Sequence, residues 1–484
     1  MLKAQKGILG LMDHERLDII SDVMALTSYG NVKNVILVAA EAAGTFDKDA
    51  FTMAVSRASA KFPVLTSHLK EIREKGQYFL VREHSQELHV PILIRELSKS
   101  NPRAPTFDSL ISHMIPLLDR DWNLFLEPPV EIHVLTMGKD HFVFGLLMHH
   151  SAGDAEAILA LLKAVLGEYE ALVSGEASPW LENPFASSTS KKKGSAERRF
   201  RWKDFLGQLW RDLPYRKVKP VLPCGTGNRQ ETREWHVKRV LSVQDSARIL
   251  KCFSQDSLHV IDHLVACTNL ALDNWNGKYD VKPGTITSAI TVNMRGRFGG
   301  TSEKNYSSVI LFRSDPDDRR EYLKFVHELA SSRIKQFEKG ADLTTRKSFL
   351  RGSKLFYYLP LGLRRRVPRF FMMHQQYSAA VTFMGSLFPR FDGEGMGRDS
   401  SLTTFGDLEI IDIHAAAYKH VGGAAMHLVV FIYRNRLSLL LATWGKFMTE
   451  AECNGFMDVL VHEIDRATHL LTSATPAIKD HATP

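Results

Sequence analysis

The stretch from residue 142 to residue 174 constrains the fold more than any other part of the chain. Residues 142–148 are apolar apart from one glycine, which predicts a strand buried on both faces. Apolar residues then recur at helical spacing up to Gly175, a natural stop. They are Ile158, Leu161, Leu162, Val165, Tyr169 and Leu172. A buried strand that runs directly into an amphipathic helix predicts an α/β protein with this junction in its interior.

The junction carries the residues that are best suited to catalysis, His149-His150-Ser151-Ala152-Gly153-Asp154-Ala155. Adjacent strand residues point to opposite faces, so we expect one histidine to be catalytic and the other structural. The same geometry makes a poor ligand set, so no metal is expected. Imidazole, with an unperturbed pKa of about 6.5, suits proton transfer near neutral pH. Asp154 is also a favoured N-cap for the following helix.

The rest of the chain alternates short apolar runs with helical patterns, which supports the α/β class. Strands are predicted at 35–40, 78–81, 90–94, 130–137, 285–292, 309–312, 380–384, 408–413, 426–433 and 437–444, and helices at 46–62, 109–118, 258–275 and 449–471. The strand at 130–137 places Glu131 and His133 on one face, so we expect it to be half exposed. The last two strands flank Arg434-Asn435-Arg436 as a hairpin.

Length and cysteine usage bound the class of protein. A chain of 484 residues is longer than one ordinary core needs, so two domains or one two-lobed domain is expected. Four cysteines without CxxC spacing are too few for a disulfide framework, which favours the cytoplasm. We expect no secretory signal, and no apolar run approaches the ~20 residues of a membrane-spanning helix.

The net charge of +8 is concentrated in one segment. Residues 191–220 contain eleven Lys and Arg against three acidic residues, so the remainder of the chain is neutral. A nucleic-acid-binding protein would carry its positive charge over a folded face. Because the charge lies in one segment here, no nucleic-acid partner is expected. Within the segment, residues 198–213 have the pattern of a basic amphipathic helix. It could lie on an anionic membrane, dock an acidic carrier protein or cover the junction between lobes.

A second basic stretch runs from Phe356 to Met373. It packs aromatic residues and methionines around Arg364, Arg365, Arg366 and Arg369. Its simplest interpretation is a helix or loop with a solvated basic face. With the segment at 198–213, it also favours a lipid-like substrate or a peripheral membrane position.

The His149-His150-xxx-Asp154 pattern, after an apolar strand and before a helix, resembles the HHxxxD signature of the CoA-dependent acyltransferase superfamily. This superfamily includes chloramphenicol acetyltransferase-like enzymes, BAHD acyltransferases, wax ester synthases and condensation domains of nonribosomal peptide synthetases. The resemblance extends over most of the chain, and Thr291-Val292-Asn293-Met294-Arg295 is its most specific stretch after the motif. The chain departs from the usual pattern at Ala155, where the family has a glycine, and lacks the DFGWG box of the BAHD branch.

The resemblance implies two chloramphenicol-acetyltransferase-like lobes with mixed β-sheets and a tunnel at their interface. The N-terminal lobe would span 1–180, a basic linker with the amphipathic helix 181–230, and the C-terminal lobe 231–484. It also implies that His150 is the general base and His149 is structural, and that Asp154 forms an ion pair, for which Arg295 is our candidate. Gly153, Ala155 and Asn293 would lie near the site.

These features together predict an acyltransferase. It would move an acyl group from a CoA or carrier-protein thioester to a hydroxyl or amine of a lipid-like or natural-product acceptor, with no resident cofactor. An acyl carrier protein is a candidate partner, and the expected location is cytoplasmic or peripheral to a membrane through 198–213. A non-catalytic condensation-like module that binds a carrier protein or synthase partner is the alternative. A metal-dependent hydrolase is a third.

Overall fold

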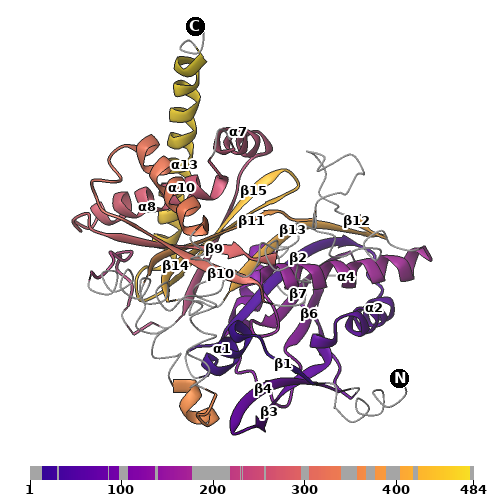
Figure 1. The fold of residues 1–484 in the computed structure, drawn as a ribbon. Helices are drawn as coiled ribbons and strands as arrows, with labels where there is room; N and C mark the ends of the chain where they lie inside the picture. Colours follow the sequence, from indigo (N-terminus) through magenta and orange to yellow (C-terminus); the bar gives the residue numbers. More distant parts are fainter. Residues whose placement is uncertain are drawn as a thin grey trace, which may run out of the picture.

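The computed structural model describes residues 14–29, 32–85, 87–97, 107–136, 140–176, 218–228, 230–231, 233–254, 258–295, 305–338, 357–366, 377–388, 404–417 and 423–479. Two six-stranded sheets and a three-stranded sheet organise these residues. The first half of the chain builds most of one lobe and the second half builds the other, with the two large sheets meeting near the centre of the molecule (Figure 1).

The N-terminal sheet has the strand order β12-β13-β2-β7-β6-β5 and is mixed, since β5 and β6 are parallel and the other pairs antiparallel. Its strands are β2 (Val35–Gly44), β5 (Ile92–Glu96), β6 (Val130–Thr136), β7 (His141–His149), β12 (Thr404–Phe405) and β13 (Leu408–Ala417). Helices α2 (Lys48–Lys61) and α4 (Ala155–Ser174) pack on one face. Helix α3 (Phe107–Met114) and the 3-10 helix η2 (Ile115–Asp119) cover the other.

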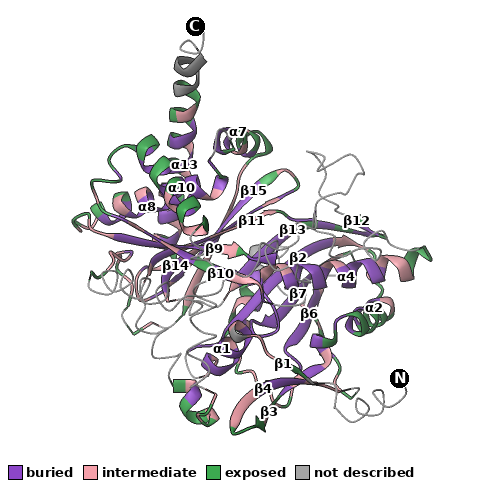
Figure 2. Cartoon of the chain, in the orientation of Figure 1, coloured by how far each residue is buried: buried purple, intermediate pink, exposed green. Residues whose placement is uncertain are grey.

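The C-terminal sheet has the order β10-β9-β11-β14-β15-β8 and is also mixed, with β11 parallel to both β9 and β14. Its strands are β8 (Glu234–Val240), β9 (Ile286–Asn293), β10 (Ser307–Ser314), β11 (Tyr377–Ser386), β14 (Ala424–Tyr433) and β15 (Arg436–Trp444). Helices α7 (Val243–Phe253), α8 (Val260–Gly277), α10 (Tyr322–Glu338) and α13 (Glu450–Lys479) bury one face in a second core. Figure 2 shows that exposed residues gather on the outer sides of these helices, whereas the sheets are largely buried.

A smaller unit completes the N-terminal lobe. Strands β1 (His14–Arg16), β3 (Ser67–Glu74) and β4 (Gln77–His84) form the three-stranded sheet, next to α1 (Ile19–Thr27) and the 3-10 helix η1 (Pro63–Thr66). Residues 361–366, which are helical, pack against this unit from the second half of the chain. The Arg364 side chain is fully buried there and forms a two-pronged ion pair with Asp22 at 3.0 and 3.1 Å.

Two features cross between the lobes. Strands β12 and β13 come from the second half of the chain yet pair with β2 in the N-terminal sheet. The expected division at residue 231 assigns these strands to the C-terminal lobe. On β14 and β15, Val429, Phe431 and Leu440 enter the N-terminal core rather than the core of their own lobe. The two lobes therefore share one buried interface.

Most predicted elements are confirmed by the structure, including the buried strand β7, the helix α4 and the hairpin at Arg434 and Asn435. Gly175 ends α4 in the left-handed conformation, with φ of 73°. The half-exposed strand predicted at 130–137 is wrong, because Glu131 and His133 are both buried in β6. They contact each other, and Arg120 forms an ion pair with Glu131, so the polar face is satisfied inside the protein.

The two basic stretches differ in how far the structure describes them. The helix predicted at 198–213 lies outside the described residues. Of the stretch 356–373, residues 357–366 are described, and the solvated basic face expected there is wrong for Arg364, which is buried. Among the described residues, no helix combines the length and apolar character needed to span a membrane.

Candidate active site

The main chain holds the turn after β7 in place. The His149 N–H donates to the Pro129 carbonyl at 2.8 Å, and the His150 N–H donates to the Asn34 carbonyl at 2.7 Å. Asn34 has a φ of +46° and donates its side-chain amide to the Met24 carbonyl at 2.8 Å. The end of α1 and the start of β2 therefore fix the backbone on which the histidines sit.

His149 packs into the face of the sheet covered by η2. Its ring is fully buried and meets the Trp122 ring edge-on at 6.4 Å between centroids. Its Nδ1 accepts the Ser151 backbone N–H at 3.2 Å and lies 2.8 Å from the Ser151 hydroxyl. Burial lowers the His149 pKa to about 3, so this ring is neutral at physiological pH. These contacts are those of a residue that shapes the turn.

His150 meets the second half of the chain instead. Asn305, which is fully buried just before β10, places its Nδ2 3.0 Å from His150 Nδ1 and 3.1 Å from the His150 carbonyl. The Asn305 Oδ1 accepts both the backbone N–H and the hydroxyl of Ser307, at 3.2 and 2.6 Å. Since those donors fix the orientation of the amide, the Asn305 N–H faces His150 Nδ1. In this state Nδ1 carries the ring's lone pair.

The surroundings of His150 favour its neutral form. Burial lowers the His150 pKa below its ordinary value, and the nearby Asp154 carboxylate opposes that shift. A neutral imidazole can accept a proton, which is the state that a general base requires. With 8% of its surface exposed, the ring is nearly shielded from bulk water.

Asp154 ties the motif to the other lobe. Its carboxylate caps α4 by accepting the Ala157 N–H at 3.1 Å. It also forms a two-pronged ion pair with Arg295, at 2.7 and 2.9 Å, and accepts the Tyr306 N–H at 2.9 Å. Both side chains of the pair are about 6% exposed. A buried pair joined by two parallel hydrogen bonds holds its geometry closely.

The residues expected near the site lie around this pair. Arg295 reaches Glu156 at 3.3 Å, Asn293 donates to Glu156, and Asn293 Oδ1 accepts the Arg295 backbone N–H at 2.9 Å. Ala155 is the first residue of α4 and is half-buried. At Gly153, an added Cβ would lie 2.5 Å from the Ala157 Cβ and 3.1 Å from the Met148 sulfur. Only glycine fits between β7 and α4 at that position.

The face of the C-terminal sheet opposite its helices carries polar side chains. In register, His427 of β14 lies beside Ala442 of β15, which lies beside His236 of β8. The Thr382 hydroxyl is 2.9 Å from both the His427 Nε2 and the Thr291 hydroxyl. The pKa of His427 is lowered to about 4, mainly by burial and in part by the nearby His236 and His150.

The structure thus places His150, Asp154 and Arg295 together and puts Gly153, Ala155 and Asn293 next to them. It separates His149, whose ring packs toward Trp122. Asn305, which the sequence did not reveal, also joins the site. Asn305 is 155 positions from His150, and it stands in no pattern that spacing or periodicity could single out. Among the described residues, no cluster of three His, Cys, Asp or Glu side chains could hold a metal.

No curated protein matches the chain. Among solved structures, the first condensation domain of the CDA synthetase matches at 14% identity with a TM-score of 0.65, covering 94% of this chain and 96% of that one. The trichothecene 15-O-acetyltransferase TRI3 from Fusarium sporotrichioides matches at 11% identity with a TM-score of 0.64, covering 94% and 95%.

A third structure, the polyketide synthase associated protein 5 from Mycobacterium tuberculosis, matches at 13% identity with a TM-score of 0.57, covering 94% of this chain and 97% of that one. At these identities the likeness concerns the fold, and it confirms the expected two-lobed α/β architecture. The family model of the condensation domain matches residues 31–290, more than half of the chain, including the motif and the start of the second lobe. The chain belongs to the condensation-domain family.

Proposed function

We propose that the protein transfers an acyl group from a thioester to a hydroxyl or amine, with His150 as the general base. The observation that carries this proposal is a buried, neutral imidazole placed where the two lobes meet and contacted from both. Acyl transfer needs a base that is uncharged at working pH and shielded from water, because water would compete as the nucleophile.

The reaction would proceed by direct transfer. The acceptor's O–H or N–H gives its proton to His150 as the oxygen or nitrogen attacks the thioester carbonyl. A C–O or C–N bond forms, the C–S bond breaks, and the proton passes from the imidazolium to the departing thiolate. The thioester supplies the activated acyl group, so the scheme needs no resident cofactor or metal.

Asn305 would hold the base in a hydrogen bond before substrate binds. Its amide N–H occupies the Nδ1 lone pair in the structure, so an acceptor must replace that hydrogen bond to be deprotonated there. Its second bond, to the His150 carbonyl, keeps the amide beside the site during the exchange. Asp154 takes no part in proton transfer in this scheme, because its carboxylate is engaged by Arg295, Ala157 and Tyr306.

The nature of the co-substrates is also part of the proposal. One structure of this fold is a variant of the starter condensation domain of rhizomide synthetase in complex with C8-CoA and Leu-SNAC. TRI3 is a 15-O-acetyltransferase. The fold thus accommodates both CoA donors and oxygen acceptors, and for this chain a CoA or carrier-protein thioester is the proposed donor. A cytoplasmic or peripheral membrane location agrees with such donors.

A donor panel tests this function. The full chain is incubated with acetyl-, octanoyl- and palmitoyl-CoA, and with the same acyl groups on a carrier protein, together with alcohol and amine acceptors. Thiol release and acylated product are measured in parallel. The proposal expects equal amounts of thiol and acylated product with at least one pair. Saturable carrier-protein binding without turnover on any pair would instead favour the non-catalytic module.

A further inference from the structure

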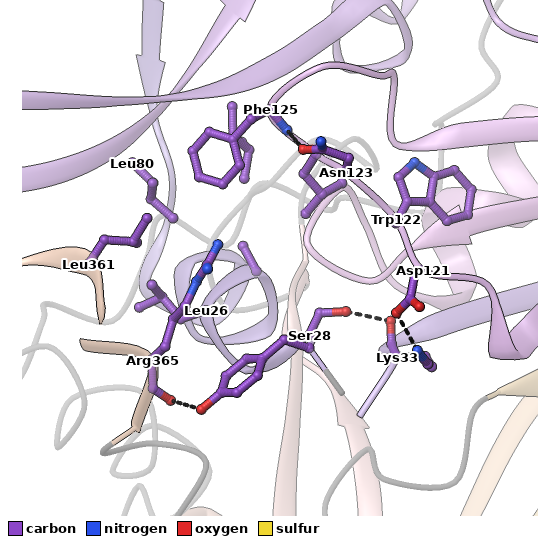
Figure 3. A pocket seen from close by; sticks show the side chains of 14 residues that line it. Leu26, Ser28, Lys33, Leu80, Asp121, Trp122, Asn123, Phe125, Leu361 and Arg365 are labelled. Atoms are coloured by element: carbon purple, nitrogen blue, oxygen red, sulfur yellow. Dashed lines mark hydrogen bonds and ion pairs between the residues drawn. The ribbon is translucent and has the colours of Figure 1, made fainter. Parts of the chain in front are cut away.

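A cavity of about 260 Å³ lies in the small unit of the N-terminal lobe (Figure 3). Helix α1, strands β3 and β4, the loop at 121–125 and the helical residues 361–366 line it, and it is partly open to solvent. At ~30 Å³ per water-sized group, this space holds about nine such groups, which is the size of a medium-length aliphatic chain.

The walls of the cavity are divided by chemistry. One side is formed by five leucines, each from a different segment: Leu26, Leu69, Leu80, Leu124 and Leu361. The other side is polar, but its charges are satisfied. Lys33 is ion-paired with Asp121, and the Ser28 hydroxyl donates to the Lys33 carbonyl at 2.7 Å. An apolar ligand body would therefore lie against the leucines.

Arg365 is the exception in this lining. Its side chain is half-buried, and Figure 3 shows its guanidinium between Leu26, Leu80 and Leu361. The guanidinium carbon lies 6.0 Å from the centre of the Phe125 ring. Within the part of the chain that the structure describes, no carboxylate forms an ion pair with Arg365. The neighbouring Arg364 forms the ion pair with Asp22.

A half-buried cation beside leucines is suited to bind an anion. Guanidinium binds carboxylates through two parallel hydrogen bonds, and these are stronger where the surroundings exclude part of the water. The adjacent apolar wall adds roughly 0.8 kcal/mol for each methylene that it removes from water. The ligand that satisfies both features has one carboxylate and an unbranched apolar body.

The cavity also lies close to the motif. Lys33 in its lining precedes Asn34, whose carbonyl accepts the His150 N–H, and Trp122 in its lining contacts the His149 ring. A smaller cavity that shares Leu69 and Leu124 with it reaches Ser151. A ligand in the larger cavity would thus contact Trp122, which packs against His149, and Lys33, the residue before Asn34.

We propose that this cavity is a binding site for a medium-chain aliphatic carboxylate, with the carboxylate on Arg365 and the chain against the leucines. The proposal does not depend on acyl transfer, because the site is formed without His150. It assigns a function to the second basic stretch of the sequence.

Binding to the full-length protein, measured by isothermal titration calorimetry without any thioester, tests the proposal. The probes are decanoate, decanol and decyltrimethylammonium, all below their micellar concentrations. Decanoate should bind at one site per chain, and at least tenfold more tightly than the other two probes. Equal affinity for the three probes, or no decanoate binding, would overturn the proposal.

Three variants locate the site. Arg365→Gln should weaken decanoate binding at least tenfold while the melting temperature stays near that of the wild type. Arg366→Gln, which changes an exposed neighbour in the same helical segment, should bind as the wild type does. His150→Ala should also retain binding, which separates this site from the proposed reaction. Unchanged affinity in Arg365→Gln would place the ligand elsewhere and refute the assignment.

Discussion

At the scale of single residues, the proposed division of roles between the two histidines rests on their different neighbours. His149 contacts Trp122 and Ser151, within the N-terminal lobe. His150 contacts Asn305, which arrives from the other half of the chain. Because adjacent strand residues alternate between faces, it was predictable that the two rings would lie on opposite faces of the sheet. The identity of the His150 partner was not predictable, because it depends on how residues 155 positions apart are brought together.

The Asn305 contact leads to a prediction about pH. Burial lowers the His150 pKa, so the rate should fall with decreasing pH only below about 6.5, where the ring becomes protonated, and be flat above it. In Asn305→Asp, a carboxylate faces Nδ1 and stabilises the imidazolium. The acidic limb of kcat/KM should then move to higher pH by about one unit or more.

Asn305→Ala is the matched control for that experiment. It removes the hydrogen bond without adding charge, so the acidic limb of kcat/KM should move by less than about half a unit. A profile for Asn305→Asp that overlays the wild-type profile would show that Asn305 does not face the ionising ring.

At the scale of elements, the site is a strand, a tight turn and a helix, and their packing leaves no spare volume. The sequence predicts β7 and α4 closely, because a continuous apolar run and helical spacing are strong local signals. It misjudges β6, because alternation with Glu131 and His133 is also compatible with a buried polar network when Arg120 is supplied from outside the strand. Periodicity reports polarity, not the partners that satisfy it.

The turn makes a prediction about Gly153. In Gly153→Ala, the new methyl group would lie 2.5 Å from the Ala157 Cβ, so α4 must shift away from β7. Overpacking of this kind costs about 1–3 kcal/mol of unfolding free energy, measured by urea denaturation. The double variant Gly153→Ala/Ala157→Gly removes the clash and should regain part of the loss. No recovery in the double variant would mean that backbone conformation, not this contact, requires the glycine.

At the scale of the whole molecule, the two halves of the chain complete each other. Arg295, Asn305 and Tyr306 reach the motif from the second half, and β13 joins the first sheet. The two-lobed α/β architecture was predictable from the family resemblance and the order of elements. The crossing of β13 was not, since strand order depends on non-local pairing that composition and spacing do not encode.

The Asp154–Arg295 ion pair connects the two lobes, so breaking it tests how much this contact stabilises the protein. Asp154→Asn removes the two close ionic contacts of the buried Arg295 guanidinium and leaves it the longer contact with Glu156, at 3.3 Å. Breaking a buried pair in this way costs about 3–5 kcal/mol of unfolding free energy, and activity should fall with it. The control is Asp458→Asn, which breaks a pair between Arg239 and a carboxylate that is 68% exposed, and should cost less than about 1 kcal/mol. Equal melting temperatures for Asp154→Asn and the wild type would show that this ion pair does not stabilise the fold.

The central claim is that His150 is the base in acyl transfer, and single-turnover kinetics test it most directly. Enzyme in excess over acyl thioester is mixed with acceptor, and acylated product is followed for the wild type, His150→Ala and the surface control His469→Ala, whose side chain is 68% exposed. Circular dichroism and donor affinity establish that each variant is folded and loaded. We predict a loss of about 10²–10⁴-fold in the transfer rate for His150→Ala and none for His469→Ala. Transfer at the wild-type rate by folded, donor-loaded His150→Ala would contradict the account.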